Sequence, residues 1–403
     1  MPGRGWLPPG VWILGGISLL TDTATEAIYP LLPLFLTGVL GARVAAVGVV
    51  EGAAEAVASV LKVVSGRLAD RLGRRRVFVV AGYSLSSLAR PLIGLAGTWG
   101  HVFALRLTDR VGKGLRSAPR DAILASLATP ETRGRVFGFH RAMDHAGAVV
   151  GPLLAAAFLW FAPGQYRTLF LLTIIPGLAV VALVTRTPRD EPRSGGTGAA
   201  VPEAANLAVG GGSWRHLPRA LRRLLLVLLL FALGNSTDAY LLLRLSDLGV
   251  ATALIPLLWS GLHVVKASTS VAGGELADRI GRRPLIVAGW CLYAAIYAGF
   301  AWVSSVAGAI ALFLVYGAYF GMTEGAEKAL VADLAPASLR GTAFGWYNAV
   351  TGFGALGASV LFGLVWELRG SAAAFGLGAA LAFASAGLLA VSRNREPRAR
   401  LES

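Results

Sequence analysis

The sequence has few charged residues and almost no cysteine for a chain of 403 residues. Only 15% of its residues are charged, whereas 55% are hydrophobic, and the mean hydropathy is +0.64. A soluble protein of this length needs far more polar surface to face water, so the composition indicates a membrane protein. The single cysteine, Cys291, excludes an internal disulfide bond and argues against a metal site built from thiolates.

The sequence also lacks the short motifs of common enzyme classes. It has no P-loop, so ATP is not expected as the energy source, and it has neither a CxxC nor an HExxH motif. We therefore expect no enzymatic activity and no cofactor. The proton gradient remains as the common source of energy.

Twelve apolar stretches are the main feature of the sequence. A hydrocarbon core of about 30 Å needs roughly 20 helical residues for one crossing. A long interruption, rich in Pro, Gly and mixed charge, is typical of a flexible linker. The sequence thus predicts an all-α membrane protein with a six-helix bundle in residues 1–186, a linker in 187–217, and a second bundle with a short basic tail in 218–403. The predicted spans are 11–38, 43–65, 77–98, 100–127, 135–161, 166–186, 220–246, 250–273, 284–304, 306–334, 342–367 and 371–392.

The position of the basic residues accounts for the formal net charge of +15. They concentrate in the loops after spans 2, 4, 8 and 10, in the linker and in the C-terminal tail, whereas the alternate loops hold few. The positive-inside rule then predicts an inner-membrane protein with both termini in the cytoplasm. Because the charge is a topology signal, we expect no nucleic-acid partner.

The two halves of the sequence repeat each other. The stretch GRLADRLGRRR from Gly66 has a near copy, GELADRIGRRP, from Gly274. Farther along, RGRVFGFHRAM from Arg133 aligns with RGTAFGWYNAV from Arg340 at an offset of 207. A duplicated six-helix unit explains both matches, and such halves usually enclose a site at their interface. Since one chain holds both halves, we expect a functional monomer.

The repeated motif resembles the most specific signature of the major facilitator superfamily of secondary transporters, and the resemblance covers essentially the whole chain. It implies two pseudo-symmetric bundles that open a central site to alternate sides of the membrane. It also implies that the motif forms a cytoplasmic gate, which holds the outward-facing state. The implied gate residues are Gly66, Asp70, Arg71, Gly73 and Arg74, with Gly274, Asp278, Arg279, Gly281 and Arg282 in the second copy.

The chemistry of the motif is compatible with such a gate. Gly66 and Gly73 permit a tight turn and close helix approach, and Asp70 can accept hydrogen bonds from arginines or from a helix N-terminus. The alternative is that the arginines only set the topology, which is the interpretation we prefer for Arg75 and Arg76.

A second motif, in the fifth predicted helix, is similar to the antiporter signature G-x-x-x-G-P-x-x-G-G. Gly147, Gly151 and Pro152 match it, whereas Ala155 and Ala156 replace its last two glycines. The partial match favours antiport, and with it export of a small organic compound.

Ionisable residues inside the predicted spans mark the expected site. A charge at a helix centre costs about 2.5 to 3.5 kcal/mol on insertion scales, so several charges on one helix must face partners or water. Four such residues of the fourth span, spaced 4, 3 and 4 apart, fall on one stripe, and we predict a water-accessible cavity lined by helices 1, 4 and 5. The residues expected to bind substrate or couple protons are Asp22, Glu26, Asp109, Lys113, Arg116, Arg120, Arg141, Asp144 and His145 in the first half, and Asn235, Asp238, Glu324 and Lys328 in the second.

Three of these carboxylates, Asp22, Glu26 and Asp144, are the candidates for carrying a transported proton. A carboxylate in a partly dry cavity takes up a proton more readily, and an approaching arginine favours its release. His145 is a candidate for the same relay because histidine titrates near physiological pH. Its alternative role is that of a hydrogen-bonded packing residue.

Charges are inverted between the aligned fourth and tenth helices. Arg120 aligns with Glu327, and Asp121 aligns with Lys328. This inversion suggests ion pairs within or between the halves that close a gate. The alternative for the tenth helix is a static pair of Glu324 with Lys328, one turn apart.

Other substrates and one other function stay open. A divalent ion such as Mn, Fe, Co or Ni could bind a mixed oxygen and nitrogen site, and an organic anion could bind arginines. A membrane receptor that does not transport is the other functional class, since a fold does not determine function. The residues concerned are Asp22, Glu26, His145, Asn235 and Asp238 for a metal ion, and Arg116, Arg120 and Arg141 for an anion.

Overall fold

The computed structural model describes residues 7–129, 132–187, 214–336 and 339–392, which are helical and contain no strand. The first half contains α1 (Pro9–Ile28), η1 (Tyr29–Leu31), α2 (Leu32–Leu34), η2 (Phe35–Val39), α3 (Val44–Leu72), α4 (Arg75–Leu92), η3 (Ile93–Leu95), α5 (Trp99–Ser126), α6 (Arg133–Phe161), α7 (Tyr166–Leu172) and α8 (Ile174–Val184). The second half contains η5 (Trp214–His216), α9 (Arg219–Gly234), α10 (Ala239–Asp247), α11 (Leu254–Ile280), α12 (Arg282–Trp302), α13 (Val306–Leu334), α14 (Arg340–Arg369) and α15 (Ser371–Val391).

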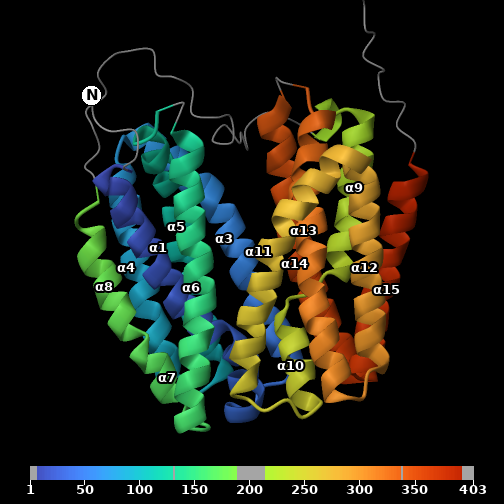
Figure 1. Cartoon of the computed structure of the whole chain (residues 1–403), viewed down its shortest axis with the longest axis horizontal. Coiled ribbons are helices and arrows are strands. Elements are labelled where there is room, and N and C mark those ends of the chain that lie inside the picture. The colour runs from blue at the N-terminus through green and yellow to red at the C-terminus, as the bar shows by residue number, and fades with distance from the viewer. Residues whose placement is uncertain (1–6, 130–131, 188–213, 337–338, 393–403) are drawn as a thin grey trace, which may run out of the picture.

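Nine segments of the described chain are long and apolar enough to cross a membrane. The helices α1, α5 and α11 are not among them, although each runs alongside the others through the molecule (Figure 1). For α5 the reason is its charge, because Arg106, Asp109, Arg110 and Lys113 lie within two turns of one another, which a lipid-facing helix does not tolerate. With these three helices the architecture agrees with the predicted all-α protein of twelve spans.

The two halves form two bundles that lie side by side in Figure 1, the first half in blue to green and the second in yellow to red. Within the first half α1 packs on α6, and α5 packs on both α3 and α4. Within the second half α11 packs on α13, and α12 packs on α15. The halves meet where α3 packs on α14 and α6 packs on α11. The predicted linker lies largely outside the described residues.

One pair of contacts shows how closely the halves repeat each other. Arg76, at the start of α4, donates to the main-chain oxygen of Thr185 after α8. Arg283, at the start of α12, donates to the main-chain oxygen of Ser392 after α15. The offset is 207 in both cases, since 283 − 76 and 392 − 185 are equal.

The repeated motif is helical for most of its length. The turn lies at Gly73, because α3 continues to Leu72 and ends at Gly73, whose φ of 63° favours glycine. At Gly66 the helix instead approaches α5, where a Cβ would lie 3.1 Å from the Cβ of Ala118. In the second copy α11 also ends at a glycine with positive φ, Gly281 at 92°, although its ψ of 151° differs from the 21° of Gly73.

The proposed gate stays a prediction. The structure describes only the backbone of three gate residues. These are Asp70 in α3 and Gly274 and Asp278 in α11. Arg282 pairs with Asp333 on α13, within the second half. Arg71, Arg74 and Arg279 are exposed.

The seventh predicted span is broken in the middle. The helix stops at Gly234 and starts again at Ala239, so Asn235 and Asp238 lie in a non-helical segment. These two residues therefore do not share a helical face. Their positions are determined by side-chain contacts in the second half.

Candidate functional site

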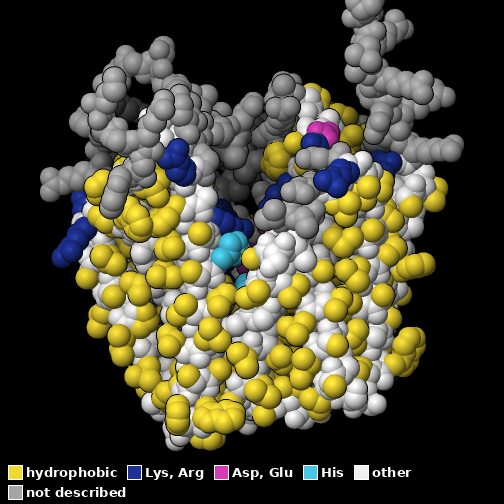
Figure 2. Space-filling model, in the orientation of Figure 1, with side chains coloured by type: hydrophobic (Ala, Val, Ile, Leu, Met, Phe, Trp, Pro, Cys, Tyr) yellow, Lys and Arg dark blue, Asp and Glu magenta, His cyan; other side chains and the backbone are white. Residues whose placement is uncertain are grey.

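A cavity of about 1240 Å³ lies between the two halves. Figure 2 shows the hollow at the top of the molecule, with basic and histidine side chains at its mouth. Residues of α1, α3, α5, α6, α11, α12, α13 and α14 line it. The predicted cavity exists, and the first, fourth and fifth predicted spans, which are α1, α5 and α6, do line it. The prediction was incomplete, since helices of the second half contribute nearly as many lining residues.

Most of the predicted site residues line this cavity. Those that do are Asp22, Glu26, Lys113, Arg116, Arg120, Arg141, Asp144, His145, Glu324 and Lys328, together with Gly66 and Arg282 of the repeated motif. Lys62, Asp121, His263, Lys266 and Asn348 line it as well. Asp109, Asn235 and Asp238 do not line it, and for these three the predicted place in the cavity was wrong.

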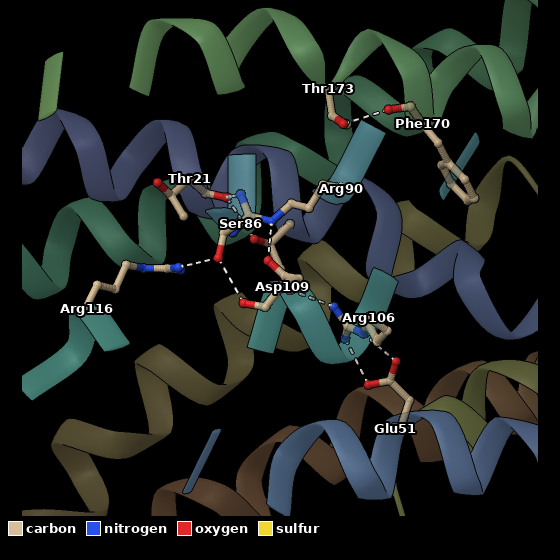
Figure 3. Close-up of polar contacts among 10 residues, drawn as sticks. Thr21, Glu51, Ser86, Arg90, Arg106, Asp109, Arg116, Phe170 and Thr173 are labelled. Carbon is tan, nitrogen blue, oxygen red and sulfur yellow. Dashed lines mark hydrogen bonds and ion pairs between the residues drawn. The ribbon is translucent and has the colours of Figure 1, made fainter. Parts of the chain in front are cut away.

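Asp109 lies in a buried network of charged groups below the cavity (Figure 3). Its Oδ1 accepts from Arg90 Nε at 2.9 Å, and its Oδ2 lies 3.4 Å from Arg106 Nη1. Arg106 binds both carboxylate oxygens of Glu51, at 2.8 and 2.9 Å. The network joins α3, α4 and α5, and removing one partner from such a set of buried charges is strongly destabilising.

Arg116 connects this network to the cavity (Figure 3). Its Nη1 donates to Ser86 Oγ at 2.6 Å, and Ser86 Oγ donates to the main-chain oxygen of Asp109 at 2.9 Å. The guanidinium also lies over the ring of Tyr83, 4.5 Å from its centroid. These contacts hold Arg116 in one place at the cavity wall.

Asp144 is the acidic group of α6 in the cavity. It accepts a hydrogen bond from Ser18 Oγ on α1 and lies 3.8 Å from Arg141. The imidazole near its carboxylate is that of His140, at 3.6 Å, and not that of His145. His145 lines the cavity, so its place in a relay stays a prediction, whereas His140 is a buried partner of Asp144.

The side of the molecule opposite the mouth, the far side, is closed by contacts between the halves. Glu26 on α1 accepts from Trp259 Nε1 on α11 at 2.8 Å. The rings of Tyr29 and Trp259 lie 5.0 Å apart, and the Tyr29 hydroxyl is 3.4 Å from Thr237 Oγ1. Two further contacts, which join Tyr166 to Thr252 at 3.4 Å and Ala45 N to Glu367 at 2.9 Å, complete this closure.

The second half places its charged residues among aromatic side chains. Asp238 accepts from the Tyr316 hydroxyl at 2.7 Å and lies 3.5 Å from Lys266. Asn235 donates to the Tyr319 hydroxyl at 3.1 Å. Both residues thus stabilise the broken seventh helix from inside the bundle.

The charged residues that align between α5 and α13, the fourth and tenth predicted spans, do not form ion pairs with each other across the halves. Glu327 is buried and accepts from Trp290 at 2.9 Å and from Tyr347 at 3.3 Å. Lys328 pairs with Glu324 one turn away, at 3.0 Å, as the static alternative predicted. Two ion pairs of the first half also form within a single helix: Arg120 pairs with Asp121 on α5, and Arg141 pairs with Asp144 on α6.

The metal alternative finds little support in the geometry. Within the described residues no three His, Cys, Asp or Glu side chains gather as a metal site would require. Of the five proposed ligands, Glu26 is bonded to Trp259, and Asn235 and Asp238 lie outside the cavity wall.

The antiporter-like motif has a clear packing role. A Cβ at Gly147 would lie 2.5 Å from the main-chain oxygen of Leu19, and a Cβ at Gly151 would lie 2.3 Å from that of Thr23. Both glycines therefore let α6 approach α1 closely, and Pro152 follows within α6.

Sequence reasoning missed four residues that organise the site. Glu51 lies in the second predicted span, as Arg90 and Arg106 lie in the third and fourth, so the rule that a charge in a span needs a partner could have identified them. Trp259 had no such signal, since an aromatic residue in a span usually packs.

Comparisons with known proteins agree with this geometry. The family model of the Major Facilitator Superfamily matches residues 14–359 and 239–403. An uncharacterised MFS-type transporter of Methanocaldococcus jannaschii is 31% identical over 369 residues, which cover 90% of this chain and 89% of the relative. The multidrug resistance protein MdtH of Photorhabdus laumondii is 29% identical over 41% of this chain and 40% of its own length.

The fold has solved counterparts. A bacterial homologue of the human lysosomal transporter Spinster, in an inward-facing and unoccupied conformation, has a TM-score of 0.71 at 18% identity, covering 95% of this chain and 94% of its own. Family and fold are thus those of membrane transporters, as the repeated motif implied. The chain belongs to the major facilitator superfamily.

Proposed function

We propose that this protein is a proton-coupled secondary transporter that exports a small organic compound by alternating access. The observation that carries the proposal is a charged cavity between two similar halves, open on one face and closed on the other by contacts between the halves. Rocking of the halves about such a site would expose it to each side in turn.

The orientation follows from charge. The open face carries both copies of the basic motif, one where α3 is followed by α4 and the other where α11 is followed by α12 (Figure 1). By the positive-inside rule we expect this face to lie in the cytoplasm. We infer that the site is open to the cytoplasm, in the inner membrane, as export requires for loading. The partial likeness to a multidrug resistance protein supports the same direction.

Proton coupling is supported by the surroundings of the acidic cavity residues. Asp22 interacts electrostatically with Glu26 and Asp144 as well as with Lys113 and Arg116. A small movement of these helices changes which charge is nearest, and that change switches a carboxylate between holding and releasing a proton. We therefore propose the proton gradient as the energy source, with no cofactor.

The test is flux in proteoliposomes with an imposed pH gradient. Purified protein is reconstituted and screened with a panel of organic cations, neutral compounds and organic anions, while an internal dye reports pH. We expect substrate movement in one direction to drive proton movement in the other. The variant Asp22→Asn should lose the proton movement, whereas Asp121→Asn, whose partner Arg120 is its neighbour in sequence, should keep it. A tight ligand without flux for any compound would instead favour the receptor function.

An organic anion is a second candidate substrate, because the cavity has more basic than acidic groups. Eight Lys or Arg and five Asp or Glu side chains line it, a difference of three positive charges. Arg116 is held at the wall by Ser86 and Tyr83 and is suited to bind a carboxylate or phosphate ester. Binding of such an anion, lost in Arg116→Ala and retained in Arg141→Ala, would support this class, and equal binding to all three proteins would exclude it.

A further inference from the structure

Glu26 occupies a special place among the cavity residues. Its Oε2 accepts the hydrogen bond from Trp259 Nε1 at 2.8 Å, and the two residues belong to different halves. Among the far-side hydrogen bonds that join the halves within the described chain, it alone has a partner that lines the cavity. The bond between Tyr166 and Thr252, for example, lies wholly outside the wall. An event inside the cavity can therefore reach the far-side closure through Glu26.

The indole of Trp259 is held by both halves. It is 3% exposed, and its ring lies 5.0 Å from that of Tyr29 and 5.1 Å from that of His263. Lys266 Nζ lies over the same ring at 5.5 Å. This packing fixes the direction of the N–H group, so the bond depends on the state of the Glu26 carboxylate.

Charged groups from each neighbouring helix lie near this bond. A hydrogen bond to an ionised carboxylate is roughly twice as strong as one to a neutral acceptor, so a proton or a donor group that engages Glu26 weakens its hold on Trp259. Asp22 on α1 and His263 on α11 interact electrostatically with Glu26, and Lys266 on α11 lies over the Trp259 ring. Lys113 and Arg116 on α5 and Asp144 on α6 interact with Asp22, His145 on α6 and Asp238 before α10 interact with His263, and Arg90 on α4 donates to the main-chain oxygen of Thr21.

We infer that Glu26 takes part in the coupling together with Asp22, and that its bond to Trp259 locks the empty carrier with the far side closed. The inference rests on the proposed function and specifies how that function is coupled. Either a proton on Glu26 or a hydrogen-bond donor of the substrate releases the lock, so the two compete for one group. The empty carrier does not change sides, and each change of side carries a substrate or a proton, which is the requirement for exchange.

The experiment measures the far-side distance between two spin labels. Cys291 is the only cysteine, so a Cys291→Ser background accepts new cysteines at Gln165 and Ala251, next to the contacting pair Tyr166 and Thr252. In this background, protein in nanodiscs should show a larger far-side-open population at acidic than at neutral pH. Trp259→Phe retains the ring and removes the donor; it should raise the ratio of open to closed carrier at neutral pH by about tenfold, as expected for one hydrogen bond to a charged group.

Two further variants complete the design. Glu26→Gln should raise the open population at neutral pH and abolish its dependence on pH. The control Asp247→Asn alters an exposed carboxylate at the end of α10 that does not line the cavity, and it should behave as the background protein. Populations that change less than twofold in both Trp259→Phe and Glu26→Gln, at both pH values, would overturn the inference.

Flux measurements separate this inference from the proposed function. Proton-driven flux that Glu26→Gln leaves intact would remove the lock and leave the transporter. Absence of flux for the whole panel, with distances that still respond to Trp259→Phe, would remove the transporter and leave the lock as a conformational contact.

Discussion

The interiors of the two halves differ in chemistry although their helices repeat each other. The first half is held by buried charges, in which Glu51, Arg106, Asp109 and Arg90 follow one another across three helices. The second half is held by aromatic rings, with Phe231 stacked on Trp290 at 4.4 Å and the rings of Tyr293 and Tyr297 4.2 Å apart, among others. The same helix arrangement is thus compatible with two kinds of interior.

The difference has a physical consequence for how each half fails. A buried ion network is stable only when each charge keeps its partner, since an uncompensated charge is strongly destabilising. An aromatic cluster spreads its energy over many ring contacts of about 0.5–1.5 kcal/mol each, so the loss of one polar group is tolerated. We expect the first half to be sensitive to single substitutions and the second half to be less so.

The largest effect should come from Arg106→Ala in the ionic half. The substitution leaves Glu51 without its partner and removes one partner of Asp109, so we expect a loss of about 3–5 kcal/mol in unfolding free energy. Thermal unfolding in detergent, followed by circular dichroism, provides the measurement. The double variant Glu51→Leu with Arg106→Leu should recover most of the loss, and a single variant as stable as the parent would contradict the comparison.

A smaller loss is expected for Trp290→Phe in the aromatic half. The ring that stacks on Phe231 remains, but Glu327 loses the donor to its Oε1, at a cost of about 1–3 kcal/mol for an unsatisfied buried acceptor. The same unfolding assay measures it. Adding Glu327→Met should restore stability; if the second change makes matters worse, the carboxylate is not the cause.

Tyr293→Phe should cost about 1 kcal/mol. The ring contacts with Tyr297 and Phe231 are retained, whereas the hydroxyl loses its hydrogen bonds, among them the one to the main-chain oxygen of Gly234 at 3.0 Å. Tyr293→Leu, which removes the ring as well, is the matched control and should be several times more costly. Equal losses in the two variants would show that the hydroxyl, and not the ring, carries the energy.

The smallest effect belongs to the cavity wall. Lys328→Gln removes a pair with Glu324 in which both side chains are about half exposed, and such helical pairs contribute about 0.3–0.5 kcal/mol. Unfolding should be nearly unchanged. A loss as large as that of Arg106→Ala would mean that the wall, and not the interior, stabilises the second half.

Much of the fold could be predicted from the sequence, whereas only part of the site could. The spans, the repeat and the glycines at which α3 and α11 end depend on hydropathy and on short local patterns. The break between Gly234 and Ala239 coincides with the run Gly-Asn-Ser-Thr-Asp, a loop signal that the prediction of one continuous helix overlooked. The spacing of His140 and Asp144, one turn apart on α6, could have identified them as neighbours, whereas the hydrogen bond from Ser18 on α1 to Asp144 depends on how the two helices pack.

The sequence by itself determined the all-helical architecture, the duplication and the distribution of positive charge, since these are properties of the chain read locally. The tertiary structure alone decided which charged side chains face water. Asp109 and Lys113 share one stripe of α5, yet Asp109 is sealed among arginines and Lys113 lines the cavity. Four residues along a helix are about 6 Å, and over that distance the packing of α3 and α4 on α5 gives way to the space where the two halves diverge.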